Sequence, residues 1–269
     1  MRIAILSDVH ANVLALQAVL DDASRRDVQV FLNLGDSLSG PLWPNETYDL
    51  LQRIGATTVA GNNDRELCEA VGKEVPGETT TGFVLKELSG QAIGWLRSLP
   101  STAVAADRVF LCHGTPAHDT GYLLEDVSRG FPVIRAEDAI LRLLGSTRFR
   151  LVVCGHSHIP RIVQLVNGTM IINPGSVGLP AYDDTVPVYH RMEAGSPLAS
   201  YAIATLRDEA WRAEVIAVPY NHRLAAEQAR SAGRHDWAAW LATGRVERIA
   251  NAEASHAVRS PWIPHTVAP

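Results

Sequence analysis

Residues 1–12, MRIAILSDVHAN, combine a short apolar run with a polar segment that follows it directly. The run at residues 3–6 stops at Ser7 and Asp8, which is typical of a buried strand that ends in a loop. Asn12 is a residue type that often begins helices, and apolar residues recur after it at helical spacing. This stretch therefore predicts a strand, a loop and a helix, in that order.

The same pattern returns twice further along the chain. Residues 30–34, VFLNL, stop at Gly35-Asp36, and residues 57–60, TTVA, stop at the segment GNND, residues 61–64. A helical pattern over residues 46–54 separates these two runs. Strands that alternate with helices in this way predict an α/β protein with a parallel sheet.

The second half of the domain has more β-structure. Two hairpins are predicted, over residues 103–112 and over residues 161–172, and the second turns at an Asn-Gly pair, the strongest short turn signal in the chain. Residues 151–154, LVVC, are a further buried strand. The β-rich runs at residues 200–206 and 214–218 predict a second, more antiparallel sheet.

The chain is expected to divide into a main domain over residues 1–220 and a helical extension over residues 221–269. Within the main domain, residues 65–99 mix helix with glycine- and proline-containing loops, and we expect a cap over the site there. The extension is expected to pack on the same domain through an apolar helical face that ends at Gly244, with a dimer contact as the alternative; the face contains Trp237, Trp240 and Leu241. Its proline-rich tail, residues 261–269, is expected to fray.

Composition excludes several classes of protein. The 269 residues are 46% hydrophobic and 20% charged, which is typical of a globular chain and excludes long disorder. A net charge of −5 provides no general attraction to nucleic acid or to anionic membranes. Three scattered cysteines form neither a disulfide framework nor a zinc cluster, and the apolar run at the N-terminus is too short for a signal segment. We therefore expect a cytoplasmic protein.

Polar residues that bind metals follow five of the predicted strands. Because the carboxyl ends of parallel strands lie at one edge of a sheet, loops that are distant in sequence can meet there. Glycines beside these residues permit tight turns and close approach of the backbone. The five segments are Asp8-Val9-His10, Gly35-Asp36, Gly61-Asn62-Asn63-Asp64, Cys112-His113-Gly114 and Gly155-His156-Ser157-His158.

The segments offer oxygen and nitrogen ligands together. In extended chain, residues i and i+2 point the same way, so that Asp8 with His10, and His156 with His158, would each supply two ligands from one loop. A mixed set suits Mn, Fe, Zn, Co or Ni better than calcium. Two divalent ions that share a carboxylate would use the whole set. The candidate ligands are Asp8, His10, Asp36, Asn62, His113, His156 and His158.

The five segments, in this order, resemble the signature of the calcineurin-like metallophosphoesterases. The segments SDVHAN at residues 7–12 and NPGSVG at residues 173–178 also resemble the small bacterial and archaeal branch of that family, which includes phosphodiesterases and diadenosine-tetraphosphatase-like proteins. Residues 1 to about 218 fit this branch. The fold that the resemblance implies is a four-layer αββα sandwich, in which helices flank two mixed β-sheets.

The resemblance also implies a role for each candidate ligand. Asp8, His10 and His158 would bind one metal ion, and Asp36 would bridge it to a second ion. The second ion would be held by Asn62, His113 and His156. A hydroxide that bridges the metals would attack phosphorus in line, and manganese is the expected activator.

One position departs from the family pattern. Many members have a histidine directly after the Gly-Asn pair, where it donates a proton to the leaving oxygen, whereas this chain has Asn63. An asparagine can bind phosphate by hydrogen bonds but cannot act as a general acid, and the loss of such a group costs about 10²–10⁴ in rate for poor leaving groups. We take Asn63 as a candidate catalytic residue and expect substrates with good leaving groups.

The sequence thus predicts a phosphodiesterase that acts on a small phosphoester, with a nucleotide among the candidate substrates. A phosphomonoesterase or a dinucleoside polyphosphate hydrolase is the alternative within the same class. A non-catalytic binding scaffold of the same fold is the alternative from another class. Neither a membrane nor nucleic acid in general is an expected partner, and oligomer formation stays open.

Overall fold

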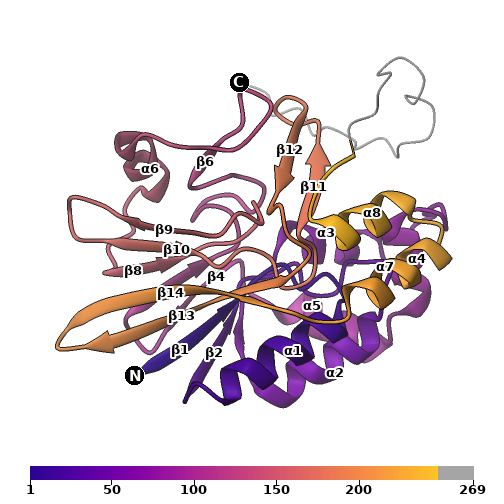
Figure 1. Cartoon of the computed structure of the whole chain (residues 1–269), viewed down its shortest axis with the longest axis horizontal. Coiled ribbons are helices and arrows are strands. Elements are labelled where there is room, and N and C mark those ends of the chain that lie inside the picture. Colours follow the sequence, from indigo (N-terminus) through magenta and orange to yellow (C-terminus); the bar gives the residue numbers. More distant parts are fainter. Residues whose placement is uncertain (248–269) are drawn as a thin grey trace.

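Strand β1 (Arg2–Leu6) lies at the centre of a five-stranded sheet in the computed structural model, which describes residues 1–247 (Figure 1). The strand order is β14-β13-β1-β2-β3. β1 pairs in parallel with β2 and β2 with β3, as the sequence predicts. The other four strands are β2 (Val30–Asn33), β3 (Thr57–Thr58), β13 (Ala199–Arg207) and β14 (Ala210–Val218).

The place of β13 and β14 corrects the sequence prediction. These strands form no separate antiparallel sheet, because β13 pairs antiparallel with β1, Ala204 lying opposite Ile3 and Ala202 opposite Ile5. Both faces of β13 are buried: Tyr201 and Ile203 pack toward the helices, while Ala202 and Ala204 pack toward the other sheet. A strand covered on both faces is stable inside a sheet, and β13 therefore occupies the free edge of β1.

The second sheet is also mixed, with the strand order β4-β5-β8-β10-β9. Its three central strands are parallel, and each edge strand is the antiparallel partner of a hairpin. Both hairpins predicted from the sequence are confirmed. The strands are β4 (Thr102–Ala105), β5 (Val109–Cys112), β8 (Leu151–Val153), β9 (Arg161–Gln164) and β10 (Met170–Asn173).

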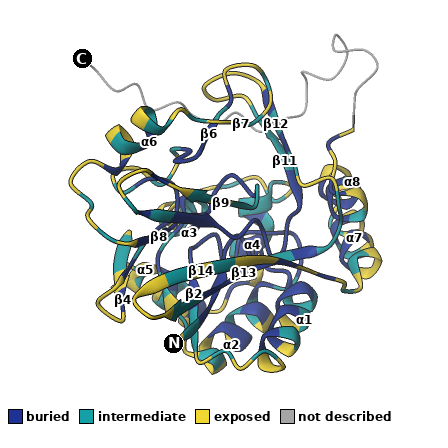
Figure 2. Cartoon of the chain, turned by 60° about the vertical axis from the view of Figure 1, so that its left-hand side comes forward, coloured by how far each residue is buried: buried dark blue, intermediate teal, exposed yellow. Residues whose placement is uncertain are grey.

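Alternation along β1 explains how the layers stack. Ile3 and Ile5 point into a core shared with Leu111 and Val153 of the second sheet, whereas Leu6 points into a core shared with the helices. Figure 2 shows the buried residues concentrated in the strands and on the inner sides of helices such as α1. Two sheets face each other with helices outside them, and the predicted four-layer αββα sandwich is confirmed.

Helices cover the outer sides of both sheets. α4 and α5, which belong to the segment expected to form a cap, bury Val84 and Ala92 in the same core as α1. A role for that segment as a cap stays a prediction. The helices of the first layer are α1 (Val13–Ser24), α2 (Pro44–Ile54), α3 (Asn62–Ala70), α4 (Thr80–Glu87) and α5 (Gly90–Ser98), and α6 (Glu137–Leu144) covers the second sheet.

The C-terminal extension forms two helices, α7 (His222–Ser231) and α8 (His235–Thr243), where the sequence predicted one helical segment. Trp237 and Leu241 pack with Leu42 and Leu179 of the main domain. α8 ends at Gly244 in a left-handed conformation, as predicted. The proline-rich tail lies outside the described residues. Two small hairpins complete the fold: β6 (Glu125–Asp126) with β7 (Val133–Ile134), and β11 (Ala181–Asp184) with β12 (His190–Glu193).

Over residues 1–247, no helix has both the length and the apolar character needed to cross a membrane.

Candidate metal centre

The five polar segments predicted from the sequence meet at the carboxyl ends of strands from both sheets. Backbone hydrogen bonds join them: Asp8 N–H donates to Gly35 O at 3.0 Å and His10 N–H to Asp36 O at 2.9 Å. In the second sheet, Gly155 N–H donates to His113 O at 2.7 Å. These backbone hydrogen bonds fix the relative positions of the loops without the need for a ligand.

The loops have a left-handed backbone where the sequence analysis assumed extended chain. The expected extended backbone is therefore wrong, although each loop still supplies two candidate ligands. Asp8 and His10 still share one group of side chains, but His156 and His158 point into different groups. A left-handed backbone at a residue other than glycine costs conformational free energy, and it persists only where the surrounding structure enforces it. Positive φ angles occur at Asp8 (54°), His10 (49°), Asp36 (52°), His156 (66°) and His158 (58°).

The candidate ligands form two buried groups of three. Within each group the ligand atoms lie within 4.8 Å of one another; the groups are Asp8, His10 and His158, and Asp36, His113 and His156. Asp36 Oδ2 lies 3.4 Å from His113 Nε2 of its own group and 4.0 Å from His10 Nε2 of the other. This carboxylate thus borders both groups.

Asn62 joins the second group through its side-chain oxygen. Asn62 Oδ1 lies 3.2 Å from His113 Nε2, and the residue is buried at the first position of α3. The structure therefore brings together all seven residues that the sequence analysis selected as ligands.

Backbone carbonyls orient the four histidine rings. Nδ1 of His10 lies 2.8 Å from Ser39 O, Nδ1 of His113 lies 2.7 Å from Leu34 O, and Nδ1 of His158 lies 2.6 Å from Leu179 O. His156 is turned the other way, with Nε2 at 3.2 Å from Thr120 O. Since a carbonyl only accepts, the outer nitrogen of each ring carries a proton and the inner nitrogen faces the cluster.

The inner atoms fit a cation. Asp8 Oδ2 accepts hydrogen bonds from Ser7 Oγ at 2.6 Å and from His156 N–H at 3.2 Å, but Asp8 Oδ1 is buried without a hydrogen bond among the described residues. His10 Nε2 and His158 Nε2 face each other at 3.2 Å. Asp8 Oδ1 lies 3.2 Å from His158 Nε2. A buried carboxylate oxygen without a hydrogen bond is costly, and a divalent ion among these atoms would remove that cost.

Charges in the cluster favour the forms that bind metal. Burial opposes ionisation of both carboxyl groups, but the imidazoles of His158 and His113 outweigh it and hold the pKa of Asp8 and that of Asp36 below the ordinary value. Burial lowers the pKa of His10, and burial with repulsion from His113 lowers that of His156 to about 4. The carboxylates are thus charged and these two histidines neutral near pH 7.

His113 differs from the other histidines of the cluster. Burial opposes its protonation, but the neighbouring Asp36 carboxylate outweighs burial and raises the pKa of His113 to about 10. A proton on the His113 ring balances part of the negative charge of Asp36. A divalent cation that replaced this proton would balance the same charge.

Asn63, the position of the departure from the family pattern, points at Asp36. Its side-chain Nδ2 donates to Asp36 Oδ2 at 2.6 Å, and its backbone N–H donates to Asp36 Oδ1 at 2.9 Å. The next residue, Asp64, accepts from the backbone N–H groups of Ser37 and Gly61, each at 3.0 Å. Both residues therefore hold the loops of the candidate centre in place.

The segment at residues 173–178 has a structural role that the sequence analysis did not assign. Ser176 Oγ donates to Asp8 O at 2.7 Å, and Gly178 N–H donates to the same oxygen at 3.0 Å. Asn173 Nδ2 donates to Gly155 O at 2.8 Å. The segment ties the first loop to the last, and the resemblance of its sequence to the family was the only signal of it.

Three aromatic rings pack on the candidate ligands, and the sequence analysis placed none of them at the site. Tyr122 stacks on His156 with ring centroids 4.8 Å apart, and Tyr182 lies edge-on to His158 at 4.6 Å. Trp237 lies edge-on to His10 at 5.6 Å. These rings come from a loop, from β11 and from α8, so that only the folded chain brings them to the site.

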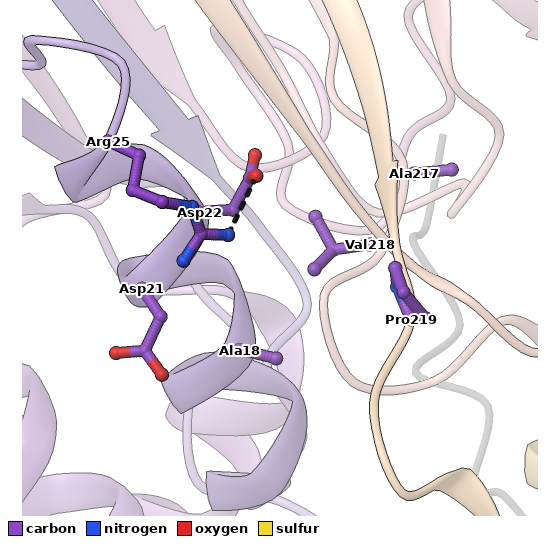
Figure 3. Close-up of a pocket in the computed structure, with 7 residues that line it drawn as sticks. All are labelled: Ala18, Asp21, Asp22, Arg25, Ala217, Val218 and Pro219. Carbon is purple, nitrogen blue, oxygen red and sulfur yellow. Dashed lines mark hydrogen bonds and ion pairs between the residues drawn. The ribbon is translucent and has the colours of Figure 1, made fainter.

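The pocket in Figure 3 is separate from this cluster. It lies between α1 and the end of β14, and none of the seven candidate ligands lines it; its residues are Ala18, Asp21, Asp22, Arg25, Ala217, Val218 and Pro219.

Two facing sheets with buried Asp and His groups at their strand ends define an α/β metallohydrolase. A sequence model of the calcineurin-like phosphoesterase superfamily domain matches residues 1–196, and the chain belongs to this family. It is accordingly a metal-dependent phosphoric ester hydrolase, in a family that binds a dinuclear divalent metal centre.

The chain is also similar to individual proteins over most of its length. An uncharacterized protein of Methanocaldococcus jannaschii is 27% identical over 242 residues, which cover 84% of this chain and 90% of that protein. The crystal structure of a metallophosphoesterase from Sphaerobacter thermophilus is 27% identical, with a TM-score of 0.72, and the match covers 91% of this chain and 100% of that one.

Proposed function

We propose that the chain is a dinuclear phosphodiesterase in which the two buried groups each hold one divalent ion. Asp8, His10 and His158 bind the first ion, Asn62, His113 and His156 bind the second, and Asp36 bridges them. The observation that supports this assignment best is the position of Asp36 Oδ2, within 4.0 Å of a histidine from each group. Manganese is the activator that we propose.

The chain's own residues prepare the site for this chemistry. When bound, the two ions supply an activated water and neutralise charge on the phosphate oxygens. Backbone carbonyls hold the four imidazoles in the orientation that binding requires. Asn63 donates to both oxygens of Asp36, and Ser7 donates to one oxygen of Asp8, while the other faces His158 Nε2 at 3.2 Å.

Two features favour a diester over a monoester. Asn63 cannot act as a general acid toward a leaving oxygen, which favours esters with good leaving groups. Arg65, the cation that follows the Asn62-Asn63-Asp64 segment, is already paired with Asp119 at 2.7 Å and Glu69 at 3.2 Å. A neutralised arginine gives little extra attraction to the second charge of a monoester. We propose a small phosphodiester, with nucleotides included, as the substrate.

Hydrolysis of a phosphomonoester or of a dinucleoside polyphosphate is the second candidate, since the same metal chemistry serves both. A non-catalytic scaffold is opposed by the complete ligand set and by Asp8 Oδ1, which is buried without a hydrogen bond among the described residues. We also propose a cytoplasmic location, because all three cysteines are free.

Hydrolysis of two nitrophenyl esters tests the proposal. Metal-stripped protein is reloaded with Mn²⁺ and assayed on bis-p-nitrophenyl phosphate and on p-nitrophenyl phosphate. We expect faster cleavage of the diester, a loss of at least about 100-fold in Asp36→Asn, and no change in Asp138→Asn, an exposed carboxylate on α6. Faster cleavage of the monoester would favour the second candidate, and no cleavage of either ester would favour the scaffold.

A further inference from the structure

The C-terminal helices reach the candidate metal centre although they lie beyond the part of the chain that matches the family. That match ends at residue 196, whereas α7 and α8 span residues 222–243. α8 packs on α7 and on β11, next to the loops of the centre (Figure 1). One side chain of α8, Trp237, extends from this contact to a candidate ligand.

Trp237 and a backbone carbonyl both contact the His10 ring. The indole lies edge-on to the imidazole, with ring centroids 5.6 Å apart and an angle of 80° between the ring planes. In addition, His10 Nδ1 lies 2.8 Å from Ser39 O. Both rings are almost fully buried, at 4% exposure for His10 and 5% for Trp237. The His10 ring thus packs against an aromatic partner in a buried environment.

Gly40 makes the approach of Trp237 feasible. A Cβ atom at this position would lie 2.2 Å from His10 O and 3.2 Å from a carbon of the Trp237 ring. Any side chain here would therefore push the first loop and the indole apart. The close packing of Trp237 on the first loop therefore depends on Gly40 of the main domain as well as on α8.

Trp237 is itself held in one orientation. The guanidinium of Arg234 lies 5.7 Å from the centroid of the indole, a cation–π contact. Arg234 is paired with Asp236 at 2.7 Å and donates to the hydroxyl of Thr80 on α4. The indole therefore packs against the main domain and against Arg234, whose own position is set by Asp236 and Thr80. An indole held in this way can restrain the imidazole of His10.

We propose that Trp237 is a positioning residue for His10, so that the C-terminal helices complete the metal centre. This inference rests on the proposed function, because it assigns His10 as a ligand. A ring that keeps the imidazole turned toward Asp8 and His158 lowers the cost of binding an ion there. Loss of a residue that orients a metal ligand typically weakens metal binding about 10- to 100-fold.

Mn²⁺ titration of four proteins tests the proposal. The metal-stripped wild type is compared with Trp237→Ala, with the conservative variant Trp237→Phe and with Trp240→Ala. Trp240 is the matched control: it lies on the same helix and in the same apolar cluster, and its ring centroid is 6.3 Å from that of Trp237, but within residues 1–247 it makes no ring contact with a candidate ligand. Its variant therefore reports the loss of packing around α8 while the Trp237 indole is kept. Calorimetry and metal analysis give the number of ions bound and the two affinities, and thermal unfolding gives the stability of each variant.

We expect the wild type to bind two ions and Trp237→Ala to bind one of them at least about tenfold more weakly. Trp237→Phe, which keeps an aromatic edge beside His10, should recover most of that affinity. Trp240→Ala should leave both affinities within twofold of the wild type even where it lowers the unfolding temperature. If Trp237→Ala does not fold, Trp237→Leu, which fills more of the space but has no ring, takes its place.

The proposal is overturned if Trp237→Ala, or Trp237→Leu in its place, keeps both affinities, or if Trp240→Ala loses as much affinity as the Trp237 variant. Either result would mean that the helices contribute stability alone. A wild-type protein that binds no Mn²⁺ would instead overturn the proposed function, and the inference with it.

Discussion

Asn63 donates two hydrogen bonds to the same carboxylate, one from its backbone N–H to Asp36 Oδ1 at 2.9 Å and one from its side chain to Asp36 Oδ2 at 2.6 Å. The residue that replaces the family's histidine therefore anchors the carboxylate that borders both groups of candidate ligands. A role in orienting Asp36 follows from this geometry, whereas the sequence suggested a contact with phosphate.

Replacement of Asn63 by alanine tests this anchoring role. We expect Asn63→Ala to weaken Mn²⁺ binding by about 10- to 100-fold, because Asp36 loses a charged hydrogen bond that orients it. Calorimetric titration of metal-stripped protein measures the change. Asn45→Ala, which removes an exposed hydrogen bond to Glu87 O, is the control and should bind Mn²⁺ like the wild type. Equal affinities in all three proteins would contradict the anchoring role.

Replacement of Asn63 by histidine should change the choice of leaving group. A histidine here could donate a proton to an alkoxide, which matters for a dinucleoside monophosphate and hardly at all for a nitrophenyl ester. We expect the ratio of kcat/KM for the dinucleoside over bis-p-nitrophenyl phosphate to rise about 10²-fold in Asn63→His. A ratio that stays the same would show that another group already supplies the proton.

Gly155 is predicted to tolerate no side chain. A Cβ atom there would lie 1.9 Å from Ser7 Oγ, the group that donates to Asp8 Oδ2. We expect Gly155→Ala to destabilise the protein by about 1–3 kcal/mol in urea unfolding, as overpacked sites do. Part of this loss should return in the double variant with Ser7→Ala, which removes the clashing oxygen.

Gly94 provides the opposite case and serves as the control for Gly155. It lies inside α5, and a Cβ atom there would meet nothing within 4 Å. Gly94→Ala should stabilise the protein by about 0.5–1 kcal/mol, because alanine favours the helix and restricts the unfolded chain. If Gly94→Ala lowers the free energy of unfolding instead, the expectation that an added Cβ atom is tolerated here is wrong.

Asp22 is expected to make the free energy of unfolding depend on pH in the acid range. It accepts hydrogen bonds from Arg26 Nε at 2.6 Å and from Tyr201 Oη at 2.8 Å, and it lines the pocket between α1 and β14 (Figure 3). Partial burial raises the pKa of this carboxyl, but the hydrogen bonds to Arg26 and Tyr201 outweigh burial, so that the pKa lies below its ordinary value of 3.8. Its stabilising contribution is therefore complete above that value and is lost as the pH falls through the lower pKa of the folded state.

Urea unfolding of Asp22→Asn at several pH values measures this contribution. We expect a loss of about 1 kcal/mol at pH 7 that shrinks below pH 4. The control is Asp138→Asn, whose exposed pair with Arg142 on α6 should have no measurable effect. A difference between Asp22→Asn and the wild type that stays constant with pH would contradict this account.

The strands and the candidate ligands could be predicted because their signals are local. Each ligand follows an apolar run directly, and the buried strands end where the polar residues begin, as at Leu6 and Asp8. The Asn167-Gly168 hairpin depends on turn geometry that two residues determine by themselves. Signals of this kind depend on a few neighbouring residues, so they can be identified without knowledge of the tertiary structure.

Long-range pairing was predicted less well. β13 was assigned to a separate sheet, because the sequence of a strand contains no mark of the partner that it pairs with. The left-handed backbone at Asp8 and His158 was also missed, since non-glycine residues adopt it only when tertiary contacts enforce it.

The sequence by itself determined the α/β class, the order of the strand-end loops and the kinds of ligand that they offer, because periodicity and residue chemistry are properties of short segments. Only the tertiary structure decided which nitrogen of each histidine faces inward, and that Trp237 lies against His10. Those relationships join residues up to 227 positions apart, and they depend on packing between elements, which no short segment contains.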